Sequence, residues 1–272
     1  MFTFHSIRSQ CEQGSREAWQ AFLGDYTPVV LKLLEIYWPN RPERHKEIWQ
    51  EALRSLGANN FERLRALSRQ AEREFLVDLR AFVFERVAAE PSAQAESREA
   101  PGPTREAVHT LLEGLPLLHQ EVLFLKLAGY SDGTLEKLIR VSPGVAQKAL
   151  ERLPGEYSSV LGREEDKSLW PGAWSCVLRQ AQAAKTDDCP PLHRFVSILD
   201  GQTTWHDKEP AERHVAGCLH CLERWTAVRE VTHWRLEAKP APAAELEALL
   251  SCLPIEVKAI SRKSFFARVL GG

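Results

Sequence analysis

The spacing of apolar residues is the feature of this sequence that most constrains its fold. Apolar residues recur three and four positions apart along almost the whole chain, whereas Val-Thr alternation is nearly absent and aromatic strand-forming residues are sparse. A period near 3.6 places apolar side chains on one face of a helix, whereas strict alternation would place them on one face of a strand. The sequence therefore predicts an all-α protein without strands.

The length and the distribution of Pro, Gly and charge predict several small domains. A chain of 272 residues corresponds to two or three domains of typical size. The stretch from Ala88 to Pro103 is small, polar and rich in Pro, so it cannot bury enough apolar surface to pack. Weaker breaks lie at Leu153–Lys167 and Lys239–Pro242. The predicted segments are a helical domain at 1–90, a linker at 91–103, a second helical domain at 104–157, a connection at 158–184, a third domain at 185–238 and a C-terminal helical tail at 239–272.

The first segment carries three amphipathic patterns, which predict three helices that share a core. Pro39 and Pro42 mark the turn after the first helix, and residues 57–60 mark the second turn. The three apolar faces consist of Trp19, Phe22, Leu23 and Tyr26, then Ile48, Trp49, Ala52, Leu53 and Leu56, and finally Phe75, Leu76, Leu79, Phe82 and Val83.

The 104–157 segment has the layout of a helix-turn-helix. Its pattern predicts helices at Pro116–Ala128, Gly133–Ile139 and Pro143–Leu153, with a turn at Gly129. Ser142 suits the N-cap of the last helix, and Pro143 suits its first position, where a missing N–H costs nothing. In a helix-turn-helix the second helix offers its N-terminal residues to the DNA major groove. A plain helical hairpin is the alternative interpretation.

This segment resembles the region-four domain of sigma-70-family factors of the extracytoplasmic-function (ECF) type. The resemblance rests on Leu115-Pro116, Glu121-Val122, Leu125, Leu127, Gly129, Ser131, Leu135, Leu138, the unbroken Val141-Ser142-Pro143-Gly144 and Leu150. The 1–90 segment is similar to region two of the same family, through the sequences at 18–22, 47–53 and 74–80. A Pro-rich linker between the two regions is also typical of the family.

The resemblance implies a transcription initiation factor that binds the RNA polymerase core and directs promoter recognition. It assigns polymerase contacts to the polar face of the 47–53 motif and DNA contacts to the start of the last helix. The implied polymerase-binding residues are Glu47, Gln50, Glu51 and Arg54, and the implied promoter-binding residues are Ser142, Gly144, Val145, Gln147, Lys148 and Arg152.

Four departures from the family pattern motivate a second hypothesis. Gln147 and Ala149 stand where the family usually has basic residues, Arg140 replaces the turn Gly, and Glu136 replaces a small Ala. The 104–157 segment carries six basic and seven acidic side chains, whereas free duplex binding normally requires a basic footprint. Either the polymerase supplies most of the affinity, or the chain is a DNA-silent adaptor, an anti-sigma-like interaction protein that binds polymerase or another sigma factor.

The third segment contains a pattern of metal ligands. His214, Cys218 and Cys221 form His-x3-Cys-x2-Cys, and Cys189 lies 25 residues before the histidine. One imidazole and three thiolates satisfy tetrahedral Zn²⁺ with no position left for water, which predicts one structural zinc ion rather than a catalytic one. His193 and His220 are rival ligands, with His220 expected to point outward, and buried free thiols are the alternative to a metal site.

This stretch resembles the zinc-binding anti-sigma domain, in which a Leu-Asp-Gly element, here Leu199-Asp200-Gly201, precedes His-x3-Cys-x2-Cys. The resemblance implies that the domain clamps the region-two-like and region-four-like domains through an intramolecular contact. Whether the thiols also sense oxidants is left open. The remaining cysteines, Cys11, Cys176 and Cys252, are expected to be ordinary buried residues.

Several functions have no support in the sequence. No Gly-rich phosphate loop, Ser/His/Asp arrangement or open metal site is visible, so we expect no enzyme and no small-molecule substrate. No run approaches the roughly 20 apolar residues of a membrane span, and no secretory signal is visible. We therefore expect a cytoplasmic protein without membrane contact, composed of a region-two-like domain, a region-four-like helix-turn-helix domain and a small zinc-binding helical domain.

Overall fold

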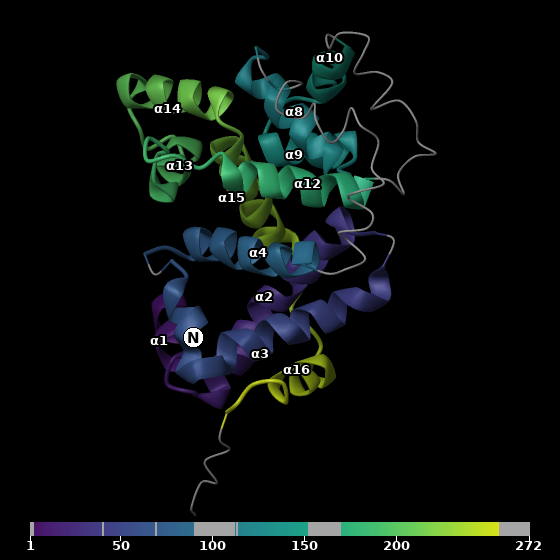
Figure 1. Ribbon diagram of the computed structural model, residues 1–272, viewed down its shortest axis with the longest axis vertical. Coiled ribbons are helices and arrows are strands. Elements are labelled where there is room, and N and C mark those ends of the chain that lie inside the picture. The colour runs from purple at the N-terminus through teal and green to yellow at the C-terminus, as the bar shows by residue number, and fades with distance from the viewer. Residues whose placement is uncertain are drawn as a thin grey trace, which may run out of the picture.

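The computed structural model describes residues 3–39, 41–68, 70–89, 112, 114–151 and 170–255. Within these ranges all regular structure is helical, which confirms the all-α class (Figure 1). The 91–103 linker and Arg152 lie outside the described residues. The described helices are α1 (Phe4–Cys11), α2 (Arg16–Tyr37), α3 (Pro42–Ala66), α4 (Glu72–Ala89), α8 (Leu117–Leu127), α9 (Asp132–Ile139), α10 (Val145–Glu151), α12 (Trp170–Ala183), α13 (Leu192–Leu199), α14 (Trp205–Gly217), α15 (Leu219–Glu237) and α16 (Ala243–Leu250).

The helices of the first segment pack through the faces that the sequence predicts. Every apolar residue named for the three predicted helices is buried, with Trp19 and Trp49 fully enclosed in α2 and α3. The turn expected at 57–60 is a break inside α3, where Asn59, Asn60 and Phe61 have φ of 50°, 55° and 62°. Helix α1 was not predicted; Thr3 caps its N-terminus by accepting a hydrogen bond from the Ser6 N–H.

Helices α8, α9 and α10 pack on one another in the order of a helix-turn-helix. The prediction that Ser142 caps the last helix and that Pro143 begins it is wrong. Instead, residues 142–145 form a turn in which the Val145 N–H donates to the Ser142 carbonyl at 3.2 Å, and α10 begins at Val145. Gly144 has φ +82°, a conformation that costs Gly little, so the Ser-Pro-Gly sequence forms a turn before the helix.

The predicted connection at 158–184 contains the helix α12, which packs against α15 and α2. The C-terminal helix α16 lies against α2. Just before it, the Ala241 N–H donates to the Gly24 carbonyl of α2 at 3.4 Å, and Lys46 of α3 pairs with Glu245 of α16 at 3.0 Å.

Helix α15 runs through the centre of the molecule, between α8–α10 and the α2–α4 layer (Figure 1). It contacts α2, α4, α8, α9, α12, α13 and α14. Buried residues occur on all sides of its middle part, including the polar Glu223, Thr226 and Glu230. A helix surrounded in this way is held by its neighbours rather than by one apolar stripe.

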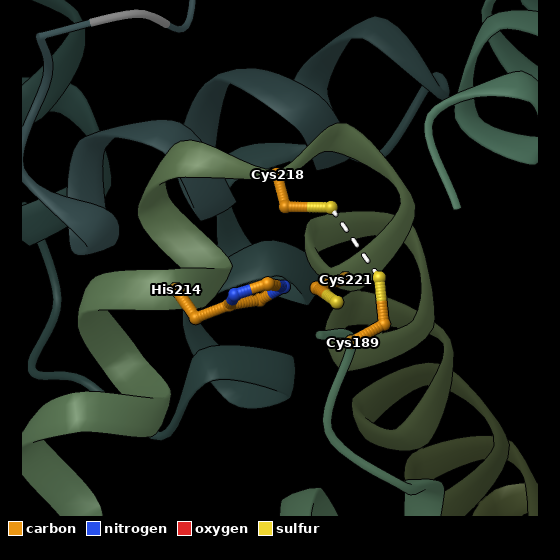
Figure 2. A group of neighbouring side chains, drawn as sticks. All are labelled: Cys189, His214, Cys218 and Cys221. Atoms are coloured by element: carbon orange, nitrogen blue, oxygen red, sulfur yellow. Dashed lines mark hydrogen bonds between the residues drawn. The ribbon is translucent and has the colours of Figure 1, made fainter. Parts of the chain in front are cut away.

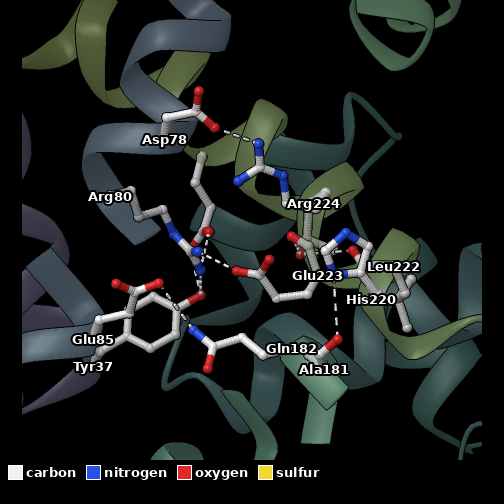
Figure 3. A network of polar contacts seen from close by, with 12 residues as sticks. Tyr37, Asp78, Arg80, Glu85, Ala181, Gln182, His220, Leu222, Glu223 and Arg224 are labelled. Carbon is white, nitrogen blue, oxygen red and sulfur yellow. Dashed lines mark hydrogen bonds and ion pairs between the residues drawn. The ribbon is translucent and has the colours of Figure 1, made fainter. Parts of the chain in front are cut away.

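A buried polar network joins α15 to α2 and α4 (Figure 3). The Arg80 guanidinium, 1% exposed, pairs with Glu223 and lies 2.9 Å from the Glu230 carboxylate. The hydroxyls of Tyr37 and Tyr130 each donate to Glu230 at 2.7 Å. Burial raises the pKa of Glu230, and the Arg80 cation opposes that shift. These buried charges are compensated only while α2, α4 and α15 stay together.

No helix among the described residues combines the length and the apolar character that crossing a membrane requires.

Replacing Arg80 tests whether this network holds the helices together. The substitution Arg80→Met leaves two carboxylates buried without their cation, so we expect it to lower the free energy of unfolding by about 3–5 kcal/mol in urea denaturation. The control Arg213→Met removes an exposed pair with Glu209 and should cost less than about 1 kcal/mol. Equal, small effects of the two substitutions would contradict the role given to Arg80.

Candidate metal centre

Three segments bring the four predicted ligands together (Figure 2). His214 lies in the last turn of α14, and Cys221 lies in the first turn of α15. Cys218 separates the two helices with extended backbone, φ −134° and ψ 113°. Cys189 comes from the connection between α12 and α13. The break at Cys218 lets its own thiol, and that of Cys221 on the second helix, approach the histidine.

The four donor atoms form a compact group. All lie within 4.8 Å of one another, and the sulfurs of Cys189 and Cys218 are 3.9 Å apart. Cys221 is fully buried, and His214, Cys189 and Cys218 are half-buried. Among the described residues outside the group, Thr186 alone hydrogen-bonds the Cys189 sulfur, and its N–H lies 3.3 Å away. The sequence prediction of this ligand set is confirmed as a group that could hold one metal ion.

The polar atoms of the group fit a cation. His214 Nε2 is buried and has no hydrogen-bond partner among the described residues, so a metal ion would satisfy it. Burial opposes ionisation of Cys189, but the neighbouring polar groups of Thr186, His214 and Cys221 outweigh burial and lower the pKa of its thiol to about 6. Burial raises the pKa of Cys221, with contributions from the neighbouring sulfurs. A bound cation would favour the thiolate at every cysteine of the group.

The rival ligands lie elsewhere. His193 is exposed on α13. His220 does not point outward as expected, because it is half-buried and its Nδ1 lies 3.2 Å from the Ala181 carbonyl of α12 (Figure 3). Outside the cluster, Cys11 is buried and Cys252 is half-buried, while the side chain of Cys176 is not described.

Cys189 also borders a cavity of about 560 Å³ between the α3–α4 pair and the connection that precedes α13. Pro190 and Pro191 line the same cavity, opposite Phe82 of α4. Cys189 of the candidate metal centre therefore lies in the wall of an open cavity between the first and third segments.

The residues expected to contact DNA are only partly exposed. Ser142, Gln147 and Lys148 are exposed, and Gly144 and Val145 are half-buried. Gln147 donates to Glu151 at 2.9 Å on the same helix. Ala149 is buried, so this position of α10 packs inward and would not suit a basic side chain.

The acidic departure at Glu136 has a structural role that the sequence did not indicate. Its Oε1 accepts a hydrogen bond from the Gly144 N–H at 2.5 Å. The side chain therefore fixes the turn between α9 and α10, which a small Ala at this position would not do.

The residues expected to contact polymerase lie on the solvent side of α3. Glu47, Glu51 and Arg54 are exposed and Gln50 is half-buried, whereas the opposite face of the same helix is buried in the core. Glu47 pairs with Arg44 one turn earlier. This polar face is available for a partner.

Sequence reasoning missed the residues that connect the third segment to the other two. Arg73 at the start of α4 holds Asp200 of the Leu-Asp-Gly element, with Nη1 and Oδ1 2.6 Å apart. Arg229 of α15 lies 2.5 Å from Glu121 of α8 and donates to the Ile139 carbonyl at 3.1 Å. Charged residues within apolar helical faces were the available signal, but their partners are too distant in the chain to be identified from spacing.

The Leu-Asp-Gly element owes its form to the end of α13. The Gly201 N–H donates to the Ile198 carbonyl at 3.0 Å, and the Gln202 N–H donates to the Ser197 carbonyl at 2.9 Å. This Schellman pair places Gly201 at φ +71°, where glycine is favoured. Asp200 is consequently held at the end of the helix, facing Arg73, whose hydrogen bond lowers the pKa of the carboxyl.

Comparison with known proteins yields no match of the chain to a protein-family model, to a curated protein or to a solved structure.

Removing one ligand should abolish metal binding. We expect about one equivalent of metal per chain in the native protein and a small fraction of that in Cys221→Ser, measured by elemental analysis after gel filtration. Loss of the ion should also lower the melting temperature by roughly 10 °C or more. The control Cys252→Ser changes a thiol outside the group and should keep its metal. Full metal content in Cys221→Ser would contradict the ligand set.

Proposed function

We propose that this chain is a sigma-type transcription initiation factor whose two DNA-reading segments are held together by its own zinc-binding segment. The 1–90 segment would bind the RNA polymerase core, and the 104–157 segment would recognise promoter DNA. Promoter recognition requires the two segments to reach separate stretches of DNA. Helix α15 would act as a clamp in cis, because it contacts both segments and would restrain them from separating.

The position of α15 is the observation that carries this proposal. Its Glu223 and Glu230 bind Arg80 of α4, and its Arg229 binds Glu121 of α8. Each of these contacts is buried or nearly so. A helix that forms ion pairs with the region-two-like segment on one side and with the region-four-like segment on another restrains the relative position of both segments.

Zinc is the ion that the donor set favours. Three thiolates and one imidazole in a compact group are typical of tetrahedral structural Zn²⁺ sites. The ion would fix the end of α14, the start of α15 and the Cys189 segment relative to one another. The zinc ion would therefore set the direction in which α15 enters the centre of the molecule.

A DNA-silent adaptor is the second candidate, and α10 supplies the observation that favours it. Lys148 is the only exposed basic residue on the described part of this helix. Ala149, where the family pattern has a basic residue, is buried. Gln147 is engaged with Glu151. An adaptor would retain the polymerase-binding face of α3 without reading a promoter.

Reconstitution with core polymerase tests the proposal and separates the two candidates. We expect the full chain to bind core polymerase and to support weak promoter-specific transcription, measured over a library of promoter fragments. The double variant Arg73→Gln, Asp200→Asn removes one contact between segments without leaving a buried charge, and should raise transcription several-fold. Polymerase binding without promoter-specific transcription in both proteins would favour the adaptor.

The polymerase face has its own matched control. Charge reversal at two exposed positions of α3, Glu47→Arg with Glu51→Arg, should weaken core binding at least tenfold in a pull-down titration. Glu62→Arg, exposed on α3 beyond the break at 58–61, should leave binding unchanged. If the native chain binds no core polymerase, the initiation factor and a polymerase-binding adaptor are both rejected.

A further inference from the structure

A cavity of about 210 Å³ lies where the three segments of the chain meet. Its walls come from the start of α4, the end of α9, the end of α13 and the last turns of α15. Arg73, Lys137, Arg140 and Arg229 contribute four cations to the lining, and Asp200 contributes the only carboxylate. The lining is therefore strongly cationic, although the chain as a whole has a formal net charge of −2.

Two of the four cations are already neutralised. Arg73 pairs with Asp200, and Arg229 pairs with Glu121. The side chains of Lys137 and Arg140 form no hydrogen bond or ion pair within the described part of the chain. Both residues are exposed at the cavity, so two cations there lack a direct ion-pair partner.

Arg140 occupies a backbone position that disfavours arginine. It ends α9 with φ 61° and ψ 50°, and the Val141 N–H donates to the Glu136 carbonyl at 3.0 Å, as in a Schellman cap. Glycine is preferred at this left-handed position, and another residue costs about 1 kcal/mol. No contact of Arg140 in the described structure offsets this strain, and strained residues of this kind concentrate at functional sites.

The cavity also has an apolar side. Leu138, Leu199 and Val228 line it, and Leu236 is 78% exposed nearby in the same lining. A small ligand with one anionic group and a compact organic part would match both walls.

We propose that this cavity is a binding site for a small phosphate-bearing metabolite, with Lys137 and Arg140 as its principal phosphate ligands. A phosphate group carries close to two negative charges and three acceptor oxygens, which suits a guanidinium and an ammonium together. Lys137 and Arg140 belong to the 104–157 segment, whereas the other walls belong to the first and third segments. A bound phosphate would therefore stabilise the arrangement in which the three segments meet at the cavity. This inference goes beyond the proposed function and does not depend on it.

The nearby ionisable groups agree with this geometry. Burial lowers the pKa of His233, the Glu237 carboxylate opposes this shift, and the Lys137 cation, which lines the same cavity, adds to it. The hydrogen bond from Arg73 lowers the pKa of Asp200, and the Arg140 cation adds to that effect. The positive charges thus act across the cavity on groups from α13 and α15.

Calorimetric titration of the full-length, metal-loaded protein tests the site. Ribose phosphate and inorganic phosphate are the probes, and ribose is the neutral control, all at constant ionic strength. We expect saturable binding of ribose phosphate, no binding of ribose, and a melting temperature that rises with ribose phosphate concentration. If inorganic phosphate binds as tightly as ribose phosphate, the ligand of this site is the free phosphate anion. Weaker binding of inorganic phosphate than of ribose phosphate supports a phosphate ester as the ligand.

Three variants make the result specific. Arg140→Gly should weaken binding of ribose phosphate at least tenfold while the unliganded protein remains as stable as the native one, because glycine relieves the left-handed strain. Lys137→Gln should weaken binding to a similar extent. Lys46→Gln removes the same charge from α3, distant from the cavity, and should have no effect. Absence of saturable binding for both phosphate probes, or equal affinity in Arg140→Gly, Lys137→Gln and the native chain, would overturn the proposal.

Discussion

The burial of Arg80 is the constraint on which the arrangement of the helices depends. A guanidinium that is 1% exposed is tolerated only when carboxylates and hydrogen-bond acceptors surround it. Those partners come from α15, through Glu223 and Glu230, and from α2, through the Tyr37 hydroxyl 2.9 Å away. Because the Tyr130 hydroxyl also donates to Glu230, the connection between α8 and α9 belongs to the same network. One buried charge thus links elements from all three predicted segments.

The candidate metal centre lies at the N-terminal end of α15, the helix that carries Glu223 and Glu230. Cys218 and Cys221 flank the first residues of α15, and Glu223 follows two positions later. A metal ion held by these thiols would fix the start of the helix, and the buried charges would then have little freedom to rearrange. Metal binding and the association of the segments are consequently expected to be coupled energetically.

The α9–α10 region shows how departures from a family pattern can be structural. Glu136 fixes the turn by accepting from Gly144, and Ala149 packs inward. These two departures therefore say little by themselves about loss of DNA recognition. Gln147 and Arg140 differ from them, because both side chains face solvent or a cavity. Any DNA contact by the proposed helix-turn-helix would therefore depend on exposed positions such as these.

The sequence by itself determined the helical class, the buried faces of α2, α3 and α4, and the set of four possible metal ligands. Those features depend on periodicity and on short spacings, such as Trp49 with Leu53 or His214 with Cys218, and local geometry fixes them. The tertiary structure alone decided that α15 lies between the other segments, that Arg80 and Glu230 pair, and that Arg140 faces a cavity. Such pairings join residues far apart in the chain. Their energy depends on how deeply the residues are buried, which local sequence spacing does not predict.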